Sequence, residues 1–157
     1  MSDSRAAADR APVYFDDLQV GQRIRTAAYT IDAAQIETFA RQFDPQPFHL
    51  DPLAAKGTFF GQLVASGWHT AAVTMRLLVE SGFPLAGGVV GAGVEIRWTK
   101  PVLPGDTLYV VSEVAELKPS RSHPNRGMVT LTNTTFNQRD EPVQTQTAHL
   151  VVQRRPG

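Results

Sequence analysis

The second half of the chain alternates apolar and polar residues, which is the pattern of β-strands. Val94, Ile96 and Trp98 alternate with charged residues, and a period of two places one apolar row on each strand face. Further β-rich runs follow over residues 108–117, 128–138 and 143–153, separated by polar or Gly/Pro-containing turns. The pattern therefore predicts four long strands after residue 88.

Apolar residues at helical spacing mark a first helix over residues 32–43. Asp32 is a suitable N-cap, and Gln35 occupies the capping-box position three residues later. Pro45 ends the helix, because the residue before a proline is pushed out of the helical region. One apolar face is predicted, formed by Ile36, Phe39, Ala40 and Phe43.

A second, longer helix is predicted over residues 66–81. Ser66 is a candidate N-cap, and Gly82 is placed to end the helix in a left-handed conformation. Arg76 and Glu80 are the only charged residues between them, so most of the helix circumference should be buried.

The remaining segments are less regular. We expect a disordered arm over residues 1–12, a single domain over residues 13–157, a first strand over residues 23–31, and an irregular, proline-stiffened stretch over residues 44–61. Strands that follow helices in the chain indicate an α+β fold with an antiparallel sheet. One apolar helix and one sheet suggest that the sheet curls around the helix.

Composition narrows the possible functions. The 157 residues carry 15 Lys and Arg against 15 Asp and Glu, and this balance disfavours nucleic-acid binding. The absence of cysteine excludes disulfides and zinc–thiolate sites. Apolar runs are too short for a membrane span, and the first ten residues lack the apolar centre of a signal peptide. We therefore expect a cytoplasmic protein that binds neither nucleic acid nor membrane.

One stretch carries candidate chemistry. Asp44 and His49 stand five residues apart in a segment stiffened by Pro45 and Pro47. Held rigidly, a carboxylate and an imidazole can activate a water molecule by general acid–base catalysis. The spacing alone fits a structural role better. A facial metal triad with Asp51 is a weaker alternative, because such triads usually draw a ligand from a distant part of the chain.

The sequence resembles the MaoC-like dehydratases, the (R)-specific enoyl-CoA hydratases of the hot-dog fold. Besides the Asp44–His49 segment, the resemblance rests on residues 14–21, 65–68, 91–98 and 101–106. It implies a hot-dog domain whose catalytic residues are Asp44 and His49. It further implies an acyl-CoA substrate, no cofactor or metal, and a homodimer or dimer of dimers. The sequence departs from the family pattern at Phe43 and Gln46, where a small residue and an asparagine are usual.

The resemblance also indicates substrate-binding residues at Ser66, Gly67 and Trp68. Since no Lys or Arg lies between Gly57 and Thr74, we expect backbone N–H groups at this helix start to bind the thioester oxygen. Alternatively, Gly67 only permits close packing of the helix on the sheet. His69 is interpreted as a core residue, and Trp68 and Trp98 as core or interface residues and not as residues that stack on the substrate. An acyl-CoA thioesterase and a non-catalytic acyl-CoA-binding module remain alternatives to the hydratase.

Overall fold

The structure is a computed structural model that describes residues 9–157. Its elements follow the order η1 (Phe15–Asp17), β1 (Arg23–Arg25), β2 (Tyr29–Thr30), α2 (Ala33–Phe43), α3 (Pro47–Leu50), α4 (Pro52–Ala55), α5 (Gly67–Ser81), β3 (Val90–Trp98), β4 (Thr107–Pro119), β5 (Arg126–Phe136) and β6 (Pro142–Gln153).

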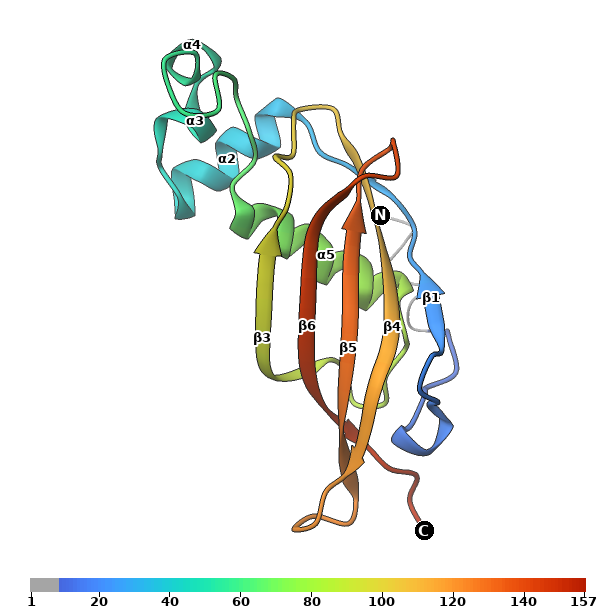
Figure 1. The fold of residues 1–157 in the computed structure, drawn as a ribbon. Helices are drawn as coiled ribbons and strands as arrows, with labels where there is room; N and C mark the ends of the chain where they lie inside the picture. Colours follow the sequence, from blue (N-terminus) through green and yellow to red (C-terminus); the bar gives the residue numbers. More distant parts are fainter. Residues whose placement is uncertain (1–8) are drawn as a thin grey trace.

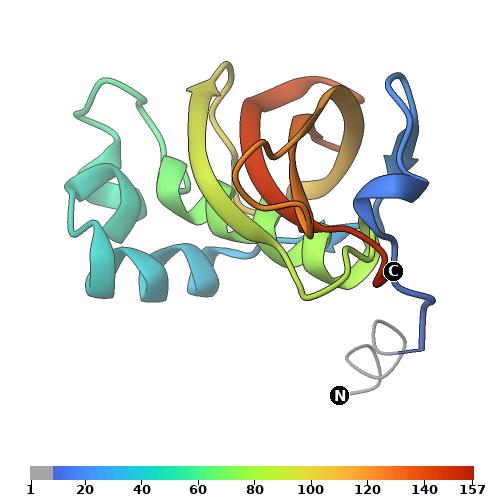
Figure 2. The same cartoon turned by 90° about the horizontal axis from the view of Figure 1, so that it is seen from below.

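The strands form one antiparallel sheet that curves around α5. Their order is β1-β4-β5-β6-β3, and β2 pairs with β4 beside β1. Figures 1 and 2 show α5 lying against the concave side of this sheet, with α2, α3 and α4 gathered beyond the N-terminal end of α5. The predicted α+β class is confirmed, and the arrangement is the hot-dog fold that the resemblance implied.

Both predicted helices form with the N-caps that the sequence indicated. Asp32 and Gln35 make a reciprocal capping box, and the Ser66 hydroxyl accepts a hydrogen bond from the Trp68 N–H. The left-handed cap predicted at Gly82 is wrong, because its φ of −80° and ψ of −159° are extended. Glycine is required there for another reason: a Cβ would lie 2.5 Å from the Leu78 carbonyl oxygen.

The strand predicted over residues 23–31 is broken in two. Thr26 lies between β1 and β2, and its hydroxyl accepts the Val110 N–H at 2.9 Å while donating to the Ala27 carbonyl at 2.8 Å. A side chain thus takes the place of a backbone acceptor in the ladder with β4. This local competition ends the regular strand.

The stretch predicted to be irregular over residues 44–61 contains two short helices. Pro47 opens α3 and Pro52 opens α4, since proline suits the first helical position, where an N–H has no intrahelical partner. Asp51 caps α4 by accepting from the Leu53 N–H at 3.0 Å. The prolines therefore start helical turns here instead of preventing them.

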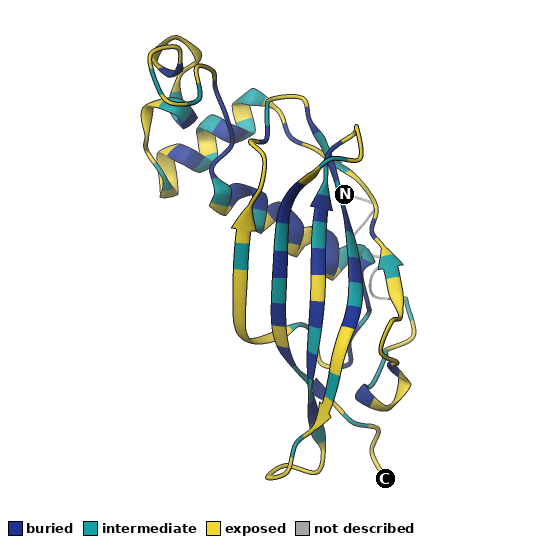
Figure 3. Ribbon diagram, in the orientation of Figure 1, coloured by how far each residue is buried: buried dark blue, intermediate teal, exposed yellow. Residues whose placement is uncertain are grey.

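Two apolar clusters form the core: one holds α5 against the sheet, and the other packs η1 and the segment after α5 against β4, β5 and β6. Burying one large aliphatic side chain contributes about 1.5–3 kcal/mol. Figure 3 shows the buried positions alternating along β4, β5 and β6, whereas β3 is exposed over almost its whole length. The cluster nearer α2 contains Ile36, Leu77, Leu108 and Val143, and the cluster nearer η1 contains Phe15, Val114, Leu131 and Val152.

An arm is predicted over residues 1–12, and residues 1–8 of it lie outside the part of the chain that the structure describes. Arg10, also assigned to that arm, donates hydrogen bonds to the carbonyl oxygens of Gly82 at 2.6 Å and Glu80 at 3.1 Å. A cation suits the C-terminal end of α5, where carbonyl groups lack helical partners. Within residues 9–157, no helix has the length and apolar character needed to cross a membrane.

Candidate active site

Asp44 and His49 face each other at the junction between α2 and α3. Asp44 is the C-cap of α2, and its carbonyl accepts the Gln46 N–H at 2.8 Å. The Gln46 carbonyl in turn accepts the His49 N–H at 2.9 Å. This tight turn leaves Nε2 of His49 3.2 Å from Oδ2 of Asp44.

The ring of His49 is buried and oriented by a backbone carbonyl. Its Nδ1 lies 2.7 Å from the oxygen of Val64, and the Val64 N–H donates to the Phe48 carbonyl at 2.9 Å. A carbonyl oxygen only accepts hydrogen bonds, so Nδ1 carries the proton. The other ring nitrogen, Nε2, is therefore the one that can exchange a proton at Asp44.

The carboxylate of Asp44 is surrounded by hydrogen-bond donors. Ser66 Oγ donates to Oδ2 at 2.7 Å, and Gln46 Nε2 donates to Oδ1 at 2.5 Å. Burial alone would raise the pKa of Asp44, but these bonds and the charge of His49 outweigh it and hold the pKa below its ordinary value. Asp44 is accordingly ionised at neutral pH.

The N-terminus of α5 opens beside this pair. Ser66 Oγ, which donates to Asp44, also accepts the Trp68 N–H at 3.2 Å. The N–H groups of His69 and Thr70 both donate to the Ser66 carbonyl. The Gly67 N–H has no acceptor among residues 9–157, and the helix dipole adds positive potential there. This N–H is available to bind an oxygen atom that carries negative charge.

A cavity of about 480 Å³ contains both Asp44 and His49. Apolar and aromatic side chains dominate its wall, which suits an acyl group more than a polar ligand. The Trp68 ring packs edge-on against Trp98, with the ring centroids 5.3 Å apart. The aromatic residues of the wall are Phe48, Phe59, Phe60, Trp68 and Trp98.

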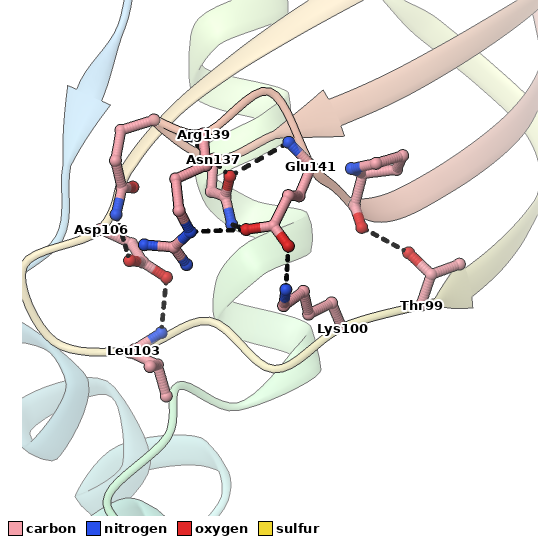
Figure 4. Close-up of polar contacts among 9 residues, drawn as sticks. Thr99, Lys100, Leu103, Asp106, Asn137, Arg139 and Glu141 are labelled. Atoms are coloured by element: carbon pink, nitrogen blue, oxygen red, sulfur yellow. Dashed lines mark hydrogen bonds and ion pairs between the residues drawn. The ribbon is translucent and has the colours of Figure 1, made fainter.

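The segment after β3 closes the cavity with Lys100, Pro101 and Val102. Figure 4 shows how the turn between β5 and β6 holds this segment. Glu141 accepts from Lys100, and the Thr99 hydroxyl donates to the Pro142 carbonyl at 2.8 Å. The cavity wall is therefore tied to a turn about forty residues away in the chain.

The same turn carries a second set of hydrogen bonds. Arg139 Nε and Asn137 Nδ2 donate to Glu141 Oε1 at 2.6 and 3.2 Å. The hydrogen bond from Lys100, followed by those from Arg139 and Asn137, lowers the pKa of Glu141 to about 2. The Asp106 carboxylate accepts from the Leu103 N–H at 2.9 Å and thereby fixes the end of the segment.

The structure thus brings together the catalytic and substrate-binding candidates that the sequence singled out, Asp44, His49, Ser66, Gly67 and Trp68. It also adds Val64 and Trp98, which sequence reasoning did not assign to the site. Trp68 and Trp98 are 60% and 46% exposed, so the interpretation of either as a core residue is wrong. No local pattern identifies Val64, because only its carbonyl contacts His49.

The structure also shows the surroundings of His69 and Asp51, which lie near the site in the sequence. His69 is buried and stacks on Phe39, as expected of a core histidine, and burial lowers its pKa. Asp51 caps α4, as described above, and does not join Asp44 and His49. Within residues 9–157, no group of three or more His, Cys, Asp or Glu side chains is placed to hold a metal ion.

Known proteins show the same sequence pattern and fold. A family model described as "MaoC like domain" matches residues 17–137. A MaoC-like dehydratase from Rhodospirillum rubrum is 54% identical, with a TM-score of 0.90 over 92% of this chain and 99% of that one. The R-hydratase PhaJ1 from Pseudomonas aeruginosa is 28% identical, with a TM-score of 0.74 over 92% of this chain and 88% of that one.

Another relative is named as a CoA thioester enzyme. The 3-hydroxybutyryl-CoA dehydratase of Methylorubrum extorquens is 35% identical over 111 residues, which are 69% of this chain and 68% of that protein. The family model, the 54% identical structure and the shared hot-dog fold agree with one another. The chain belongs to the MaoC-like dehydratase family.

Proposed function

We propose that this protein adds water across the 2,3 double bond of an enoyl-CoA thioester, or removes it in the reverse direction. The observation that carries the proposal is the 3.2 Å contact between His49 Nε2 and Asp44 Oδ2 inside an apolar cavity. Such a pair can hold one water molecule over C3 of the substrate. The acyl-CoA substrate and the (R) configuration of the product are supported by the named relatives.

In the proposed reaction, Asp44 and His49 share the proton transfers. The water oxygen bonds to C3 while the Asp44 carboxylate takes one water proton. Protonated His49 gives its Nε2 proton to C2, which completes the addition of water. A proton then crosses from Asp44 to His49 over their contact and restores the starting state. Both additions come from the same pair, so water adds to one face of the double bond.

The N-terminus of α5 stabilises the charge that develops during this reaction. Attack at C3 moves electrons through C2 toward the thioester oxygen, which becomes negative in the transition state. The Gly67 N–H donates to that oxygen without a lysine or arginine. Removing one such donor typically reduces turnover by about a hundredfold or more.

We also propose that the protein is a homodimer joined along β3. This strand is one edge of the sheet, because β6 is its only partner strand among the described residues. Val90, Val94 and Trp98 on β3 are each about half exposed, as are Met75 and Val79 on α5. A second copy paired along this edge would cover these side chains and lie next to the cavity.

One assay separates the proposed hydratase from its alternatives. Purified protein is mixed with short-chain, long-chain and aromatic trans-2-enoyl-CoA substrates, and absorbance of the conjugated double bond is followed together with free thiol. A hydratase removes the absorbance without releasing thiol, and chiral analysis of the product gives the configuration. Thiol release would identify a thioesterase, and binding without either change would identify a binding module. Either result would contradict the proposal.

A further inference from the structure

Trp98 contacts the first residue of α5 in two ways. Its indole Nε1–H donates to the Gly67 carbonyl at 3.0 Å and to Gln144 Oε1 at 3.0 Å. The indole ring lies so close to Gly67 that a Cβ there would be 2.5 Å from the nearest indole carbon. The structure therefore confirms the alternative role predicted for Gly67, which is to permit close packing of the helix on the sheet. The residue of the sheet that packs against it is Trp98.

A buried chain of hydrogen bonds continues from Trp98 into the core. Gln144 Nε2 donates to Thr74 Oγ1 at 3.1 Å, and the hydroxyls of Thr74 and Thr135 lie 2.7 Å apart. Gln144, Thr74 and Thr135 are all fully buried. The residues Trp98, Gln144 and Thr135 are direct partners across β3, β6 and β5.

This chain connects the sheet to α5 at two points. Gly67 is the first residue of the helix, and Thr74 lies about two turns further on. Buried polar groups that lose their partners are unfavourable, so both bonds oppose rotation or sliding of α5 on the sheet. Trp98 holds the carbonyl of Gly67 and packs against its α-carbon, and thereby limits movement of the nitrogen bonded to that carbon.

We propose that Trp98, held in place by Gln144, is a positioning residue for the Gly67 N–H. The inference rests on the proposed function, because it assigns that N–H to the thioester oxygen. An oxyanion donor acts at about 2.7–3.1 Å, and a displacement of about 1 Å in a site reduces the rate by about a hundredfold. Trp98 acts through Gly67, and Gln144 acts through Trp98 without lining the cavity.

The first test measures anchoring of the helix and does not depend on catalysis. Trp98→Phe removes the N–H, Gln144→Met removes one of its two acceptors, and Tyr109→Phe is a control that loses a bond to Asp140 in the turn between β5 and β6. We expect amide hydrogen exchange of His69 and Thr70 to rise by about three- to tenfold in the first two variants and to stay unchanged in the control. Unchanged exchange in both variants would overturn the proposal.

The second test separates positioning from substrate contact. If Trp98 positions the Gly67 N–H for the transition state, both variants lower kcat by about tenfold and leave KM within about twofold. A raised KM with unchanged kcat would show that Trp98 only contacts substrate, and would overturn the positioning role. If the unmodified protein has no hydratase turnover, the proposed function fails, whereas the exchange experiment still decides whether Trp98 and Gln144 anchor α5.

Discussion

The hydroxyl of Ser66 lies 2.7 Å from Oδ2 of Asp44 and joins the carboxylate to the start of α5. The same oxygen accepts the Trp68 N–H. One side chain thus caps the helix and orients the candidate catalytic acid–base pair. The proposed water-activating pair and the proposed oxyanion donor are therefore linked through Ser66, although they lie in separate segments of the chain.

Replacing Asp44 tests the water-activating pair directly. Asp44→Asn keeps the shape of the side chain but removes the base, so hydratase turnover should fall by about a hundredfold or more. The midpoint of thermal unfolding should change little, because the amide can still accept the Ser66 hydroxyl. Loss of enoyl-CoA absorbance measures the rate. Turnover near that of the unmodified protein would refute the assignment of Asp44.

Replacing Ser66 should shift the pH dependence of the reaction. The Ser66 hydroxyl helps to hold the pKa of Asp44 low, so Ser66→Ala raises that pKa. Asp44 must be ionised to act as a base, and activity is lost as the pH falls through its pKa. The acid limb of the kcat profile should therefore move to higher pH in Ser66→Ala.

Ser66→Ala should also lower the free energy of unfolding by about 1 kcal/mol through loss of the N-cap. Ser66→Thr retains a hydroxyl and is the matched control, for which both the pH profile and the stability should stay close to those of the unmodified protein. An acid limb at the same pH in all three proteins would show that Ser66 does not act on Asp44.

Glu141 should stabilise the wall of the cavity in a pH-dependent manner. Its pKa is lowered from 4.5 to about 2 in the folded protein, so its contribution is complete above about pH 4.5 and is lost as the pH falls toward 2. Glu141→Gln should therefore lower the midpoint of thermal unfolding at neutral pH. The difference in midpoint between the variant and the unmodified protein should shrink as the pH falls from about 4.5 toward 2. Glu116→Gln is the control, because exposed Glu116 forms no ion pair within residues 9–157.

Val94 tests the proposed dimer. It is 51% exposed at the centre of β3, so Val94→Lys leaves the core intact but places a charge at this edge of the sheet. Sedimentation at micromolar concentration should give a dimer for the unmodified protein and a monomer for Val94→Lys. Val20 is 64% exposed, between η1 and β1, and Val20→Lys should remain dimeric. A monomeric unmodified protein would contradict the proposal.

Gly67 and Trp98 should be energetically coupled. Gly67→Ala forces a Cβ into the indole ring, so we expect a loss of about 1–3 kcal/mol in the free energy of unfolding. In a Trp98→Ala background the space is open, and the same substitution should have almost no effect. Urea unfolding of the two single variants and the double variant gives the coupling. Equal losses in both backgrounds would show that the close contact is unimportant.

Local chemistry in the sequence determined the main elements, and the family resemblance supplied the candidate catalytic residues. Asp32 and Gln35 cap α2 through residues three apart, and alternating apolar residues specify the long strands over residues 107–153. The spacing of Asp44 and His49 alone favoured a structural role, and the pair stood out through its likeness to the family motif; the short turn between them brings their side chains into contact.

The tertiary structure decided how these groups are held. His49 receives its orientation from Val64, Gly67 from Trp98, and the cavity wall from Glu141, at sequence separations of 15, 31 and 41 residues. Thr26 breaks a strand only because Val110 lies opposite it. Each contact forms where two distant segments meet, and its geometry follows from the path of the folded chain around α5. The spacing of residues in the sequence does not specify that path, so these contacts cannot be predicted from it. They form only when the sheet folds around the helix.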